Sequence, residues 1–208
     1  MRSAKAGKIG SGGRRICGVD EAGRGPLAGP VVAAAVILSP KKKIDGLTDS
    51  KLLSPAKRLC LFLEILHKAD CWQVSAVSCE VIDKVNVLRA SLLAMRDAVV
   101  RLDIRPDIVY VDGNFLIPDL DVAQEAVIDG DLTVPQISAA SIVAKVTRDM
   151  YMYQMSKIYT GYGFEQHKGY CTEEHLKILD QLGPCEIHRR SFSPVSQISM
   201  WQGHNRDS

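Results

Sequence analysis

The sequence predicts an α/β fold with a central mixed β-sheet flanked by α-helices. Three observations lead to this prediction: short, β-branched apolar runs come early, stretches with helical apolar spacing interleave with them, and glycine and proline separate the segments. With 208 residues, of which 46% are hydrophobic, the chain can bury a substantial core. No apolar run approaches the length of a membrane span, so we expect no association with a membrane.

The first two predicted strands lie on either side of a glycine-rich turn. Residues 16–19 form a short apolar run that ends at Asp20 and Glu21, and residues 31–38 form a longer run that is almost wholly apolar. Residues 23–30 contain three glycines and two prolines between the two runs. We therefore expect two buried strands joined by a tight turn.

The first helix is predicted to begin after Ser54, because serine caps helices and Pro55 suits the first helical position. Residues 72–77 indicate another strand. Helical spacing in the first helix continues at Ala56, Leu59, Cys60, Leu63, Leu66 and His67. A second, longer helix is expected to bury a stripe formed by Val81, Val85, Leu88, Leu92, Met95, Val99 and Leu102.

Two further predicted strands also end in acidic residues. Residues 108–111 end at Asp112, and residues 126–128 end at the Asp129-Gly130-Asp131 sequence. Residues 137–145 then indicate a helix with an Ala and Ser face, which allows close approach to a sheet. Thr172 opens the last clear helix, and Gly183-Pro184 ends it.

The charge of the chain is unevenly distributed. The formal net charge is +2, but residues 1–15 carry five basic residues and no acid, which leaves −3 on residues 16–208. A basic, glycine-rich arm therefore precedes a slightly acidic body. Six cysteines are present without a C-x-x-C pair or a secretory signal, which favours reduced thiols and a cytoplasmic location. His167, Cys171 and His175 leave zinc binding open as a minor alternative, although they are expected to straddle a loop and a helix.

Acidic residues at the ends of three predicted strands form the main candidate site. Each could simply start a turn, as Asp-Gly sequences often do. Brought together, however, these carboxylates would repel one another unless a cation lay between them, and Mg²⁺ prefers oxygen ligands. Two such ions can activate water and stabilise the leaving oxygen in phosphodiester cleavage. The glycines of the adjacent Gly23-Arg24-Gly25 sequence allow close backbone approach to a sugar or phosphate.

The stretch V-D-E-A-G-R-G-P-L-A-G-P-V at residues 19–31 closely resembles the opening signature of the type 2 ribonucleases H, the bacterial-like ribonuclease HII family. Further segments match in family order, and the resemblance covers about residues 16–195. These segments are residues 49–54, 111–114, 137–149, 167–170 and 188–192. The resemblance implies a ribonuclease H-like catalytic domain over residues 15–195, preceded by a flexible arm at 1–14 and followed by a tail of unknown role at 196–208.

The resemblance also implies the site and its chemistry. The catalytic and metal-binding set carried over is Asp20, Glu21, Asp112 and Asp131, with two Mg²⁺ or Mn²⁺ ions as cofactors. Gly23, Arg24 and Gly25 are implied to bind the ribose 2′-hydroxyl, and Tyr170 to pack on the next sugar. Candidate phosphate contacts are Lys51, Lys168, Arg189 and Arg190, and Asn86 is either another contact or a helix cap. The expected partners are RNA–DNA hybrids and duplex DNA that contains ribonucleotides. In such duplex DNA, the enzyme is expected to nick on the 5′ side of the ribonucleotide. It is expected to act as a monomer.

Two departures from the family pattern bear on this prediction. Asp129 stands where the family usually has lysine, which removes a positive charge beside the site, and Cys171 stands where glycine is usual. They motivate one alternative, a catalytically silent nucleic-acid-binding module. The related type 3 enzymes form another, but they usually carry an added N-terminal domain for which residues 1–14 are too short.

Overall fold

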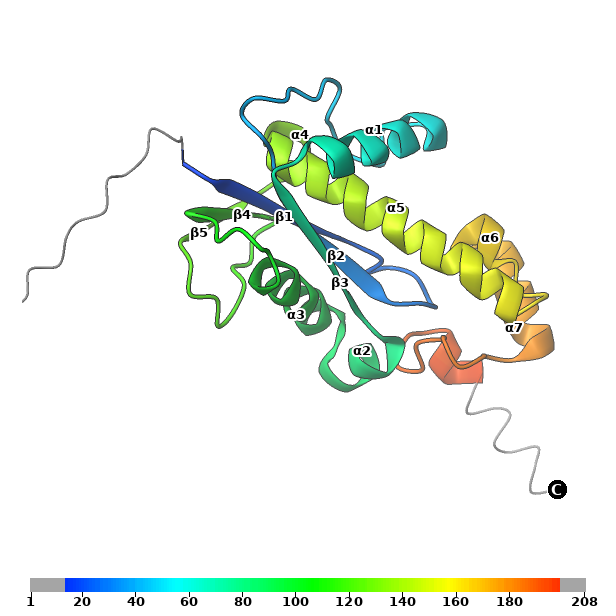
Figure 1. Cartoon of the computed structure of the whole chain (residues 1–208). Helices are drawn as coiled ribbons and strands as arrows, with labels where there is room; N and C mark the ends of the chain where they lie inside the picture. Colours follow the sequence, from blue (N-terminus) through cyan, green and yellow to red (C-terminus); the bar gives the residue numbers. More distant parts are fainter. Residues whose placement is uncertain (1–13, 199–208) are drawn as a thin grey trace, which may run out of the picture.

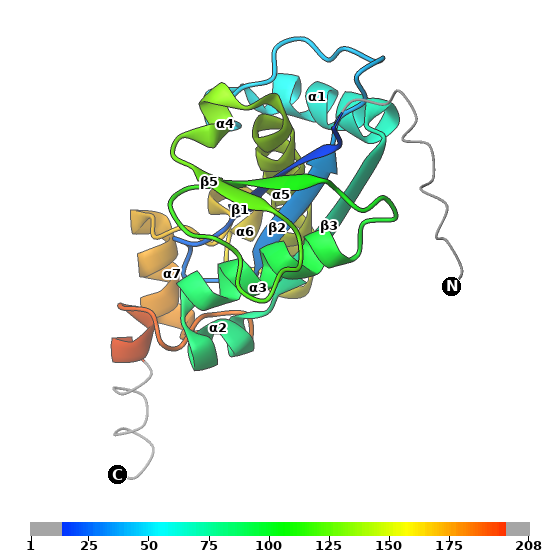
Figure 2. The ribbon, with the colours of Figure 1, turned by 90° about the vertical axis from the view of Figure 1, so that its left-hand side faces the viewer.

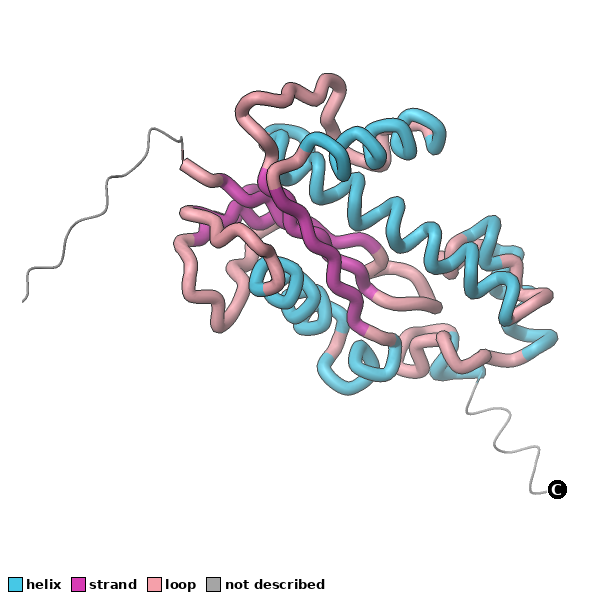
Figure 3. The backbone as a smooth tube through the Cα atoms, in the orientation of Figure 1, coloured by secondary structure: helices cyan, strands magenta, loops and turns pink. Residues whose placement is uncertain are grey.

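The computed structural model describes residues 14–198 and centres on one five-stranded sheet. The strand order is β3-β2-β1-β4-β5, with β1 and β2 antiparallel, β2 and β3 antiparallel, and the pairs β1–β4 and β4–β5 parallel. The predicted mixed sheet is therefore confirmed (Figure 3). The strands are β1 (Ile16–Ala22), β2 (Val31–Ile37), β3 (Cys71–Val77), β4 (Ile108–Asp112) and β5 (Gln124–Val127).

Helices cover both faces of the sheet (Figures 1 and 2). One face packs against α3, and the other packs against α1 and the long α5. Residues of β1 and β2 alternate between the two cores, as a pleated strand requires: Val19 belongs to the α3 side and Ala34 to the α5 side. The helices are α1 (Pro55–Lys68), α2 (Cys79–Val85), α3 (Val87–Val100), α4 (Gly130–Thr133), α5 (Pro135–Ile158), α6 (Phe164–His167) and α7 (Glu173–Leu182).

The small-residue face of α5 lies directly on β1. Ala139, Ala140 and Ala144 are fully buried there, and a Cβ added to Gly18 would overlap the backbone of Gln136. The predicted close approach of helix to sheet is thus confirmed, although α5 continues to Ile158, well beyond the predicted residues 137–145. This tight packing fixes α5, and the polar side chains it carries, relative to the acidic end of β1.

The predicted inward row of α1 is wrong. Leu59 is 48% exposed and Leu63 is 59% exposed, whereas Leu61 and Ile65 are fully buried. Both rows have helical spacing, so the spacing alone does not choose between them. Leu61 and Ile65 pack in the core between β2 and α5, and the Arg58 guanidinium ties the helix to the loop before it by donating to the Ser50 and Leu53 carbonyls.

The single long helix predicted across residues 81–102 is also wrong, because the chain forms α2 and α3 with a break between them. Asn86 lies at the break with φ +71°, and its side chain accepts a hydrogen bond from the backbone N–H of Arg89. With ψ 164°, this backbone conformation lies outside the left-handed helical region and is one that mainly glycine adopts, while the side chain caps the new helix. Met95 and Val99 of the predicted stripe are buried in α3, beside Ala90, Ala94 and Ala98.

The remaining element boundaries agree closely with the sequence. Ser54 caps α1 through the backbone N–H of Lys57, and Thr172 caps α7 through that of His175. Strand β5 ends at Val127, one residue before the predicted end. Within residues 14–198, no helix has both the length and the apolar character needed to cross a membrane. Residues 1–13 of the predicted arm and 199–208 of the predicted tail lie outside the described residues.

Candidate active site

The parallel pairing of β1 with β4 brings two of the predicted acids together. Val19 is in register with Val111, so the next residues, Asp20 and Asp112, stand on neighbouring strands. Their position in the pleat turns both side chains to the same side of the sheet. Two apolar runs far apart in the sequence therefore present their terminal carboxylates at one place.

Asp20 is buried and strongly perturbed. Asp20 is only 5% exposed, and its Oδ1 accepts a hydrogen bond from the backbone N–H of Glu21 at 2.7 Å. Burial raises the pKa of Asp20 well above its ordinary value, and the neighbouring charges of Glu21 and Asp112 raise it further. A hydrogen bond from Ser141 on α5 opposes this shift by stabilising the carboxylate. The groups around Asp20 therefore supply too little positive charge to stabilise its ionised carboxylate.

Glu21 follows on the same strand and has a partial counter-charge. Burial raises its pKa, and the positive charge of Arg24 lowers it in part. The Arg24 guanidinium lies 3.4 Å from Glu21 Oε1, and about half of the arginine side chain is exposed. The interaction is therefore a weak, solvent-screened ion pair that leaves Arg24 able to reorient.

The turn after β5 brings in the fourth acid. Asp129 adopts a left-handed conformation with φ +52°, and the chain then enters the short α4. This conformation places the backbone N–H of Asp131 3.3 Å from Asp112 Oδ1, while Asp129 itself is exposed. Burial raises the pKa of Asp131, and the charges of Asp112 and Asp49 add to the effect. The pKa of Asp112 is likewise raised by burial.

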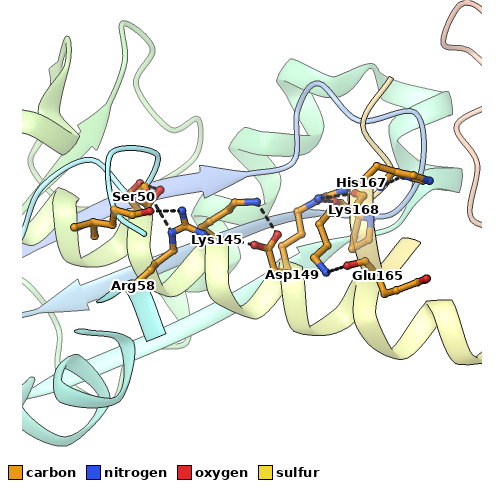
Figure 4. A network of polar contacts seen from close by, with 12 residues as sticks. Ser50, Arg58, Lys145, Asp149, Glu165, His167 and Lys168 are labelled. Atoms are coloured by element: carbon orange, nitrogen blue, oxygen red, sulfur yellow. Dashed lines mark hydrogen bonds and ion pairs between the residues drawn. The ribbon is translucent and has the colours of Figure 1, made fainter. Parts of the chain in front are cut away.

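Lys51 reaches this acidic group from the loop before α1. Its Nζ lies 3.9 Å from Asp131 Oδ2, and the side chain is 79% exposed. The loop is fastened to α5 by the Ser50 and Ser141 hydroxyl groups, whose oxygens lie 3.0 Å apart, and to α1 by Arg58, which donates to the Ser50 carbonyl at 2.7 Å. Figure 4 shows this attachment at one end of a series of polar contacts that continues along α5 to the turn around residue 168.

The donor set fits hard divalent cations chemically. All four acids carry raised pKa values, and Asp20 and Asp131 are each raised in part by the charge of a neighbouring acid, so a cation would relieve a repulsion that already exists. Across residues 14–198, however, no three His, Cys, Asp or Glu side chains are gathered into a ready-made metal site. Holding an ion therefore requires side-chain rotation, for which the partly exposed Glu21 and Asp112 have room.

The Gly23-Arg24-Gly25 loop lies next to the acids, between β1 and β2. Gly23 is buried with φ +99°, and a Cβ there would clash with Arg148, so the fold requires this glycine. Gly25 is different, since it is exposed, has no left-handed φ, and an added Cβ would meet nothing within 4 Å. Its missing side chain leaves open surface that another molecule can approach.

Tyr170 is joined to this loop through its neighbours. The backbone N–H of Leu27 donates to the carbonyl of Gly169 at 2.8 Å, and a Cβ on Gly169 would clash with the Ala28 carbonyl. The Tyr170 ring is 40% exposed and lies 5.6 Å from Lys145 Nζ. The ring therefore stays at the surface, held by a turn that is packed against the glycine loop.

A chain of neutral histidines supports the Tyr170 turn from behind. Since a carbonyl only accepts, His175 Nδ1–H donates to the Tyr170 carbonyl at 2.9 Å, and His175 Nε2 must accept from His188 Nε2–H at 3.1 Å. His188 Nδ1 then accepts from the Cys185 backbone N–H at 3.0 Å. Burial lowers the pKa of His175 to about 4 and that of His188 to about 3, in agreement with this neutral arrangement.

The minor zinc alternative gains no support from this geometry. His167 and His175 stack on each other with ring centroids 4.2 Å apart, and Cys171 is exposed in the turn between α6 and α7. His167 Nδ1 accepts from Gly169 and its Nε2 donates to Tyr162, so both nitrogens are already used. The predicted separation of the three residues between a loop and helices is confirmed.

The predicted phosphate contacts occupy different surroundings. Lys168 is held by its own turn, where Nζ donates to the Glu165 carbonyl at 2.6 Å. The backbone of Arg190 donates to Asp83 on α2, and Asn86 caps α3. The prediction of Arg189 as a phosphate contact is wrong, because this residue is fully buried and its guanidinium donates to carbonyls of the glycine loop.

Two contributors were missed by the sequence analysis. Ser141 was assigned only to the small packing face of α5, yet it also hydrogen-bonds Asp20. Arg148 lies in the same matched segment and is fully buried against the loop between β1 and β2. A serine facing a sheet and an arginine near an acid carry no local signal of these contacts, because the contacts depend on where α5 crosses the strands.

Comparisons with known proteins agree on one family. The family model described as Ribonuclease HII matches residues 17–195. The ribonuclease HII of Burkholderia ambifaria is 53% identical over 182 residues, which cover 88% of this chain and 83% of that protein. The ribonuclease HII of Caldicellulosiruptor bescii is also 53% identical, over 88% of this chain and 89% of that protein.

Solved structures resemble the fold as a whole. The ribonuclease H2 of Pyrococcus horikoshii superposes with a TM-score of 0.74 at 29% identity, covering 90% of this chain and 98% of that one. The Archaeoglobus fulgidus RNase HII, solved in a complex with PCNA, gives a TM-score of 0.74 at 26% identity, covering 86% and 95%. Bst-RNase HIII in complex with Mn²⁺ shares the fold, with a TM-score of 0.70 at 18% identity over 93% of this chain and 71% of that one.

Proposed function

The chain belongs to the ribonuclease HII family of hydrolytic endoribonucleases, and we propose that it nicks duplex DNA on the 5′ side of single embedded ribonucleotides. Membership gives the broader activity, ribonuclease H action on RNA–DNA hybrids. In the proposed reaction, water attacks phosphorus in line, and the bond to the 3′ oxygen of the preceding nucleotide breaks. The products carry a 3′-hydroxyl and a 5′-phosphate.

The observation that carries this proposal is the placement of Asp20 and Asp112 on neighbouring strands, with Glu21 following Asp20 and the backbone of Asp131 hydrogen-bonded to Asp112, next to a glycine loop that is exposed at Gly25. Asp20 and Asp112 would hold two Mg²⁺ or Mn²⁺ ions, and Glu21 and Asp131 would complete the ligand set. When bound, these ions would supply an activated water and stabilise the leaving oxygen. Ser141 opposes the raised pKa of Asp20 in part, and Lys51 neutralises part of the charge around Asp131.

Selection of the substrate is assigned to the loop and the tyrosine. The 2′-hydroxyl is the group that separates RNA from DNA at one nucleotide, and it both donates and accepts hydrogen bonds. The backbone of Gly23, Arg24 and Gly25 would recognise that hydroxyl, because Gly25 leaves room for a sugar to approach. Tyr170 would pack on the sugar of the next deoxynucleotide, with Lys168, Arg190 and Asn86 as candidate phosphate contacts.

The same proposal covers the rest of the chain. We propose residues 15–195 as the catalytic domain and a monomer as the working unit, because one chain supplies all four acids and the loop. Duplex DNA as the substrate makes the cytoplasm the proposed location. The five basic residues among residues 1–15 would add salt-sensitive attraction to phosphate, so deleting residues 1–14 should weaken binding at low salt without moving the cleavage position.

The test uses a labelled duplex that carries one ribonucleotide, incubated with Mg²⁺ or Mn²⁺. We expect a nick 5′ of the ribonucleotide, and we expect Asp20→Asn to abolish it while an exposed control, Asp103→Asn, cuts normally. No nick with either metal would refute the activity and favour the silent binding module. Normal cleavage by Asp20→Asn would refute the assigned site.

A further inference from the structure

Two arginines behind the glycine loop are fully buried without an acidic partner. Arg148 and Arg189 are both 0% exposed, and within residues 14–198 neither forms an ion pair. Burying an unpaired charge is unfavourable by several kcal/mol unless hydrogen bonds compensate for lost water. These two guanidinium groups therefore need hydrogen-bond acceptors within the protein.

Both arginines donate to backbone carbonyls of the loop between β1 and β2. Arg189 donates through NH1 to the Arg24 carbonyl at 2.8 Å, through Nε to the Gly29 carbonyl at 3.0 Å, and through NH2 to the Gly23 carbonyl. Arg148 donates through Nε to the Pro30 carbonyl at 3.0 Å and through NH2 to the Ala28 carbonyl at 2.9 Å. One loop thus turns five of its carbonyls towards two cations.

This arrangement fixes the direction of the loop amides. In a trans peptide the carbonyl and the following N–H point in opposite directions. With the Gly23 and Arg24 carbonyls turned inward onto Arg189, the N–H groups of Arg24 and Gly25 turn outward. Both of these residues are exposed, and within residues 14–198 no hydrogen bond uses either N–H group. Two successive outward amides form a small concave surface suited to an oxygen ligand.

The second arginine also connects the loop to the tyrosine. Arg148 NH1 donates to the Lys168 carbonyl at 3.1 Å, and its guanidinium carbon lies 5.7 Å from the centre of the Tyr170 ring. The backbone of Arg189 donates to the Leu27 carbonyl at 2.8 Å, which adds a third attachment to the same unit. The outward amides and the exposed ring are therefore held at a fixed separation by the same buried pair.

We propose that Arg148 and Arg189 are positioning residues for ribose recognition: they aim the Arg24 and Gly25 amides at the 2′-hydroxyl and set their distance from Tyr170. This inference rests on the proposed function and adds to it the residues that determine its selectivity. Arginine is required at both positions, because only its planar fork with five donors can hold several inward carbonyls at once. Lysine keeps the charge but loses the fork.

The test measures discrimination rather than activity alone. For Arg189→Lys and Arg148→Lys, KM and kcat are measured on the duplex with one ribonucleotide, and Ki is measured for the same duplex made wholly of DNA. The ratio of Ki to KM reports recognition of the single hydroxyl. We expect each variant to lower this ratio at least ten-fold, mainly through KM, while the Mg²⁺ concentration giving half-maximal rate stays within two-fold. Arg101→Lys, at an exposed helix end, is the matched control and should leave the ratio unchanged.

The outcomes separate this inference from the proposed function. Failure of the wild-type chain to nick the single-ribonucleotide duplex refutes the proposed function itself. If the wild type nicks and the folded variants keep their ratio within two-fold, the arginines only stabilise the fold and the inference is overturned. A folded variant that loses kcat with an unchanged KM overturns it as well. All ratios are taken at least 10 °C below the melting temperature of each variant, so reduced stability does not obscure the result.

Discussion

Replacing Asp20 by Asn should stabilise the metal-free protein. Burial and the charges of Glu21 and Asp112 raise the pKa of Asp20, so ionisation of Asp20 is less favourable in the folded chain than in the unfolded one. Asparagine keeps an oxygen that can accept the Glu21 N–H but carries no charge. The substitution therefore removes an unfavourable charge and leaves the local hydrogen bond in place.

The register of the sheet gives the magnitude. Asp20 and Asp112 stand on adjacent strands about 4.8 Å apart, and two full charges at that separation repel by about 3 kcal/mol at an effective dielectric constant of about 20. Asparagine is a poorer acceptor from Ser141, which offsets part of the gain from removing this repulsion, so we expect a gain of about 1–2 kcal/mol in unfolding free energy. For a domain of this size, that gain raises Tm by roughly 2–8 °C.

The assay is thermal unfolding in EDTA from pH 4 to pH 8, with Asp103→Asn as the exposed control. A folded-state pKa above the unfolded value means that stability is present at low pH and is lost as pH rises through the folded pKa. The advantage of Asp20→Asn should therefore be small near pH 4 and grow towards pH 8. Adding Mg²⁺ should raise the Tm of the wild type more than that of the variant. An equal or lower Tm for Asp20→Asn at pH 8 would refute the electrostatic argument.

Three further predictions concern the loop, the serine and the histidines. Gly25→Ala should leave Tm within about 1 °C, because its Cβ meets nothing, but should lower kcat/KM on a single-ribonucleotide duplex at least ten-fold; unchanged kinetics would show that the open surface is not used. Ser141→Ala should raise the pKa of Asp20 further and move the acidic limb of the kcat/KM–pH profile to higher pH, whereas an unmoved limb would contradict the hydrogen bond. His188 and His175 are neutral in the fold with lowered pKa values, so stability should fall as pH drops from about 6.5 towards 4, by up to about 1.4 kcal/mol per pH unit for each imidazole. His188→Gln should reduce that slope in urea unfolding experiments, and an unchanged slope would count against the neutral pair.

Sequence patterns located the acids along the chain because the signal is local. An apolar run followed by an acid predicts a strand end: β4 ends at Asp112 and β5 ends just before the turn that carries Asp131, whereas β1 continues through Asp20 and Glu21 to Ala22. That these ends meet depends on the β1–β4 pairing, which periodicity does not encode. The family resemblance supplied the grouping instead, and the backbone N–H of Asp131 lies 3.3 Å from Asp112 Oδ1, while the charge of Asp129 also raises the pKa of Asp112.

The failures have a common physical cause, which is competition between equivalent local patterns. In α1, two apolar rows share helical spacing, and packing against β2 and α5 buries the row that contains Leu61 and Ile65. In the stretch after β3, the apolar stripe continues across Asn86, but that residue adopts φ +71° and starts a new helix. Arg189 failed for a different reason: charged residues are rarely buried, and only the inward carbonyls of the loop make its burial tolerable.

The buried positive and negative charges of this fold are not paired with one another. Arg148 and Arg189 use their donors on carbonyls of the loop rather than on carboxylates. The four acids retain raised pKa values and have only weak, exposed counter-charges from Arg24 and Lys51. A protein built only for stability would pair these groups. Keeping them separate leaves the negative charge available for divalent cations and directs the backbone amides towards the sugar, so the two costly buried features of this fold support the two halves of one proposed reaction.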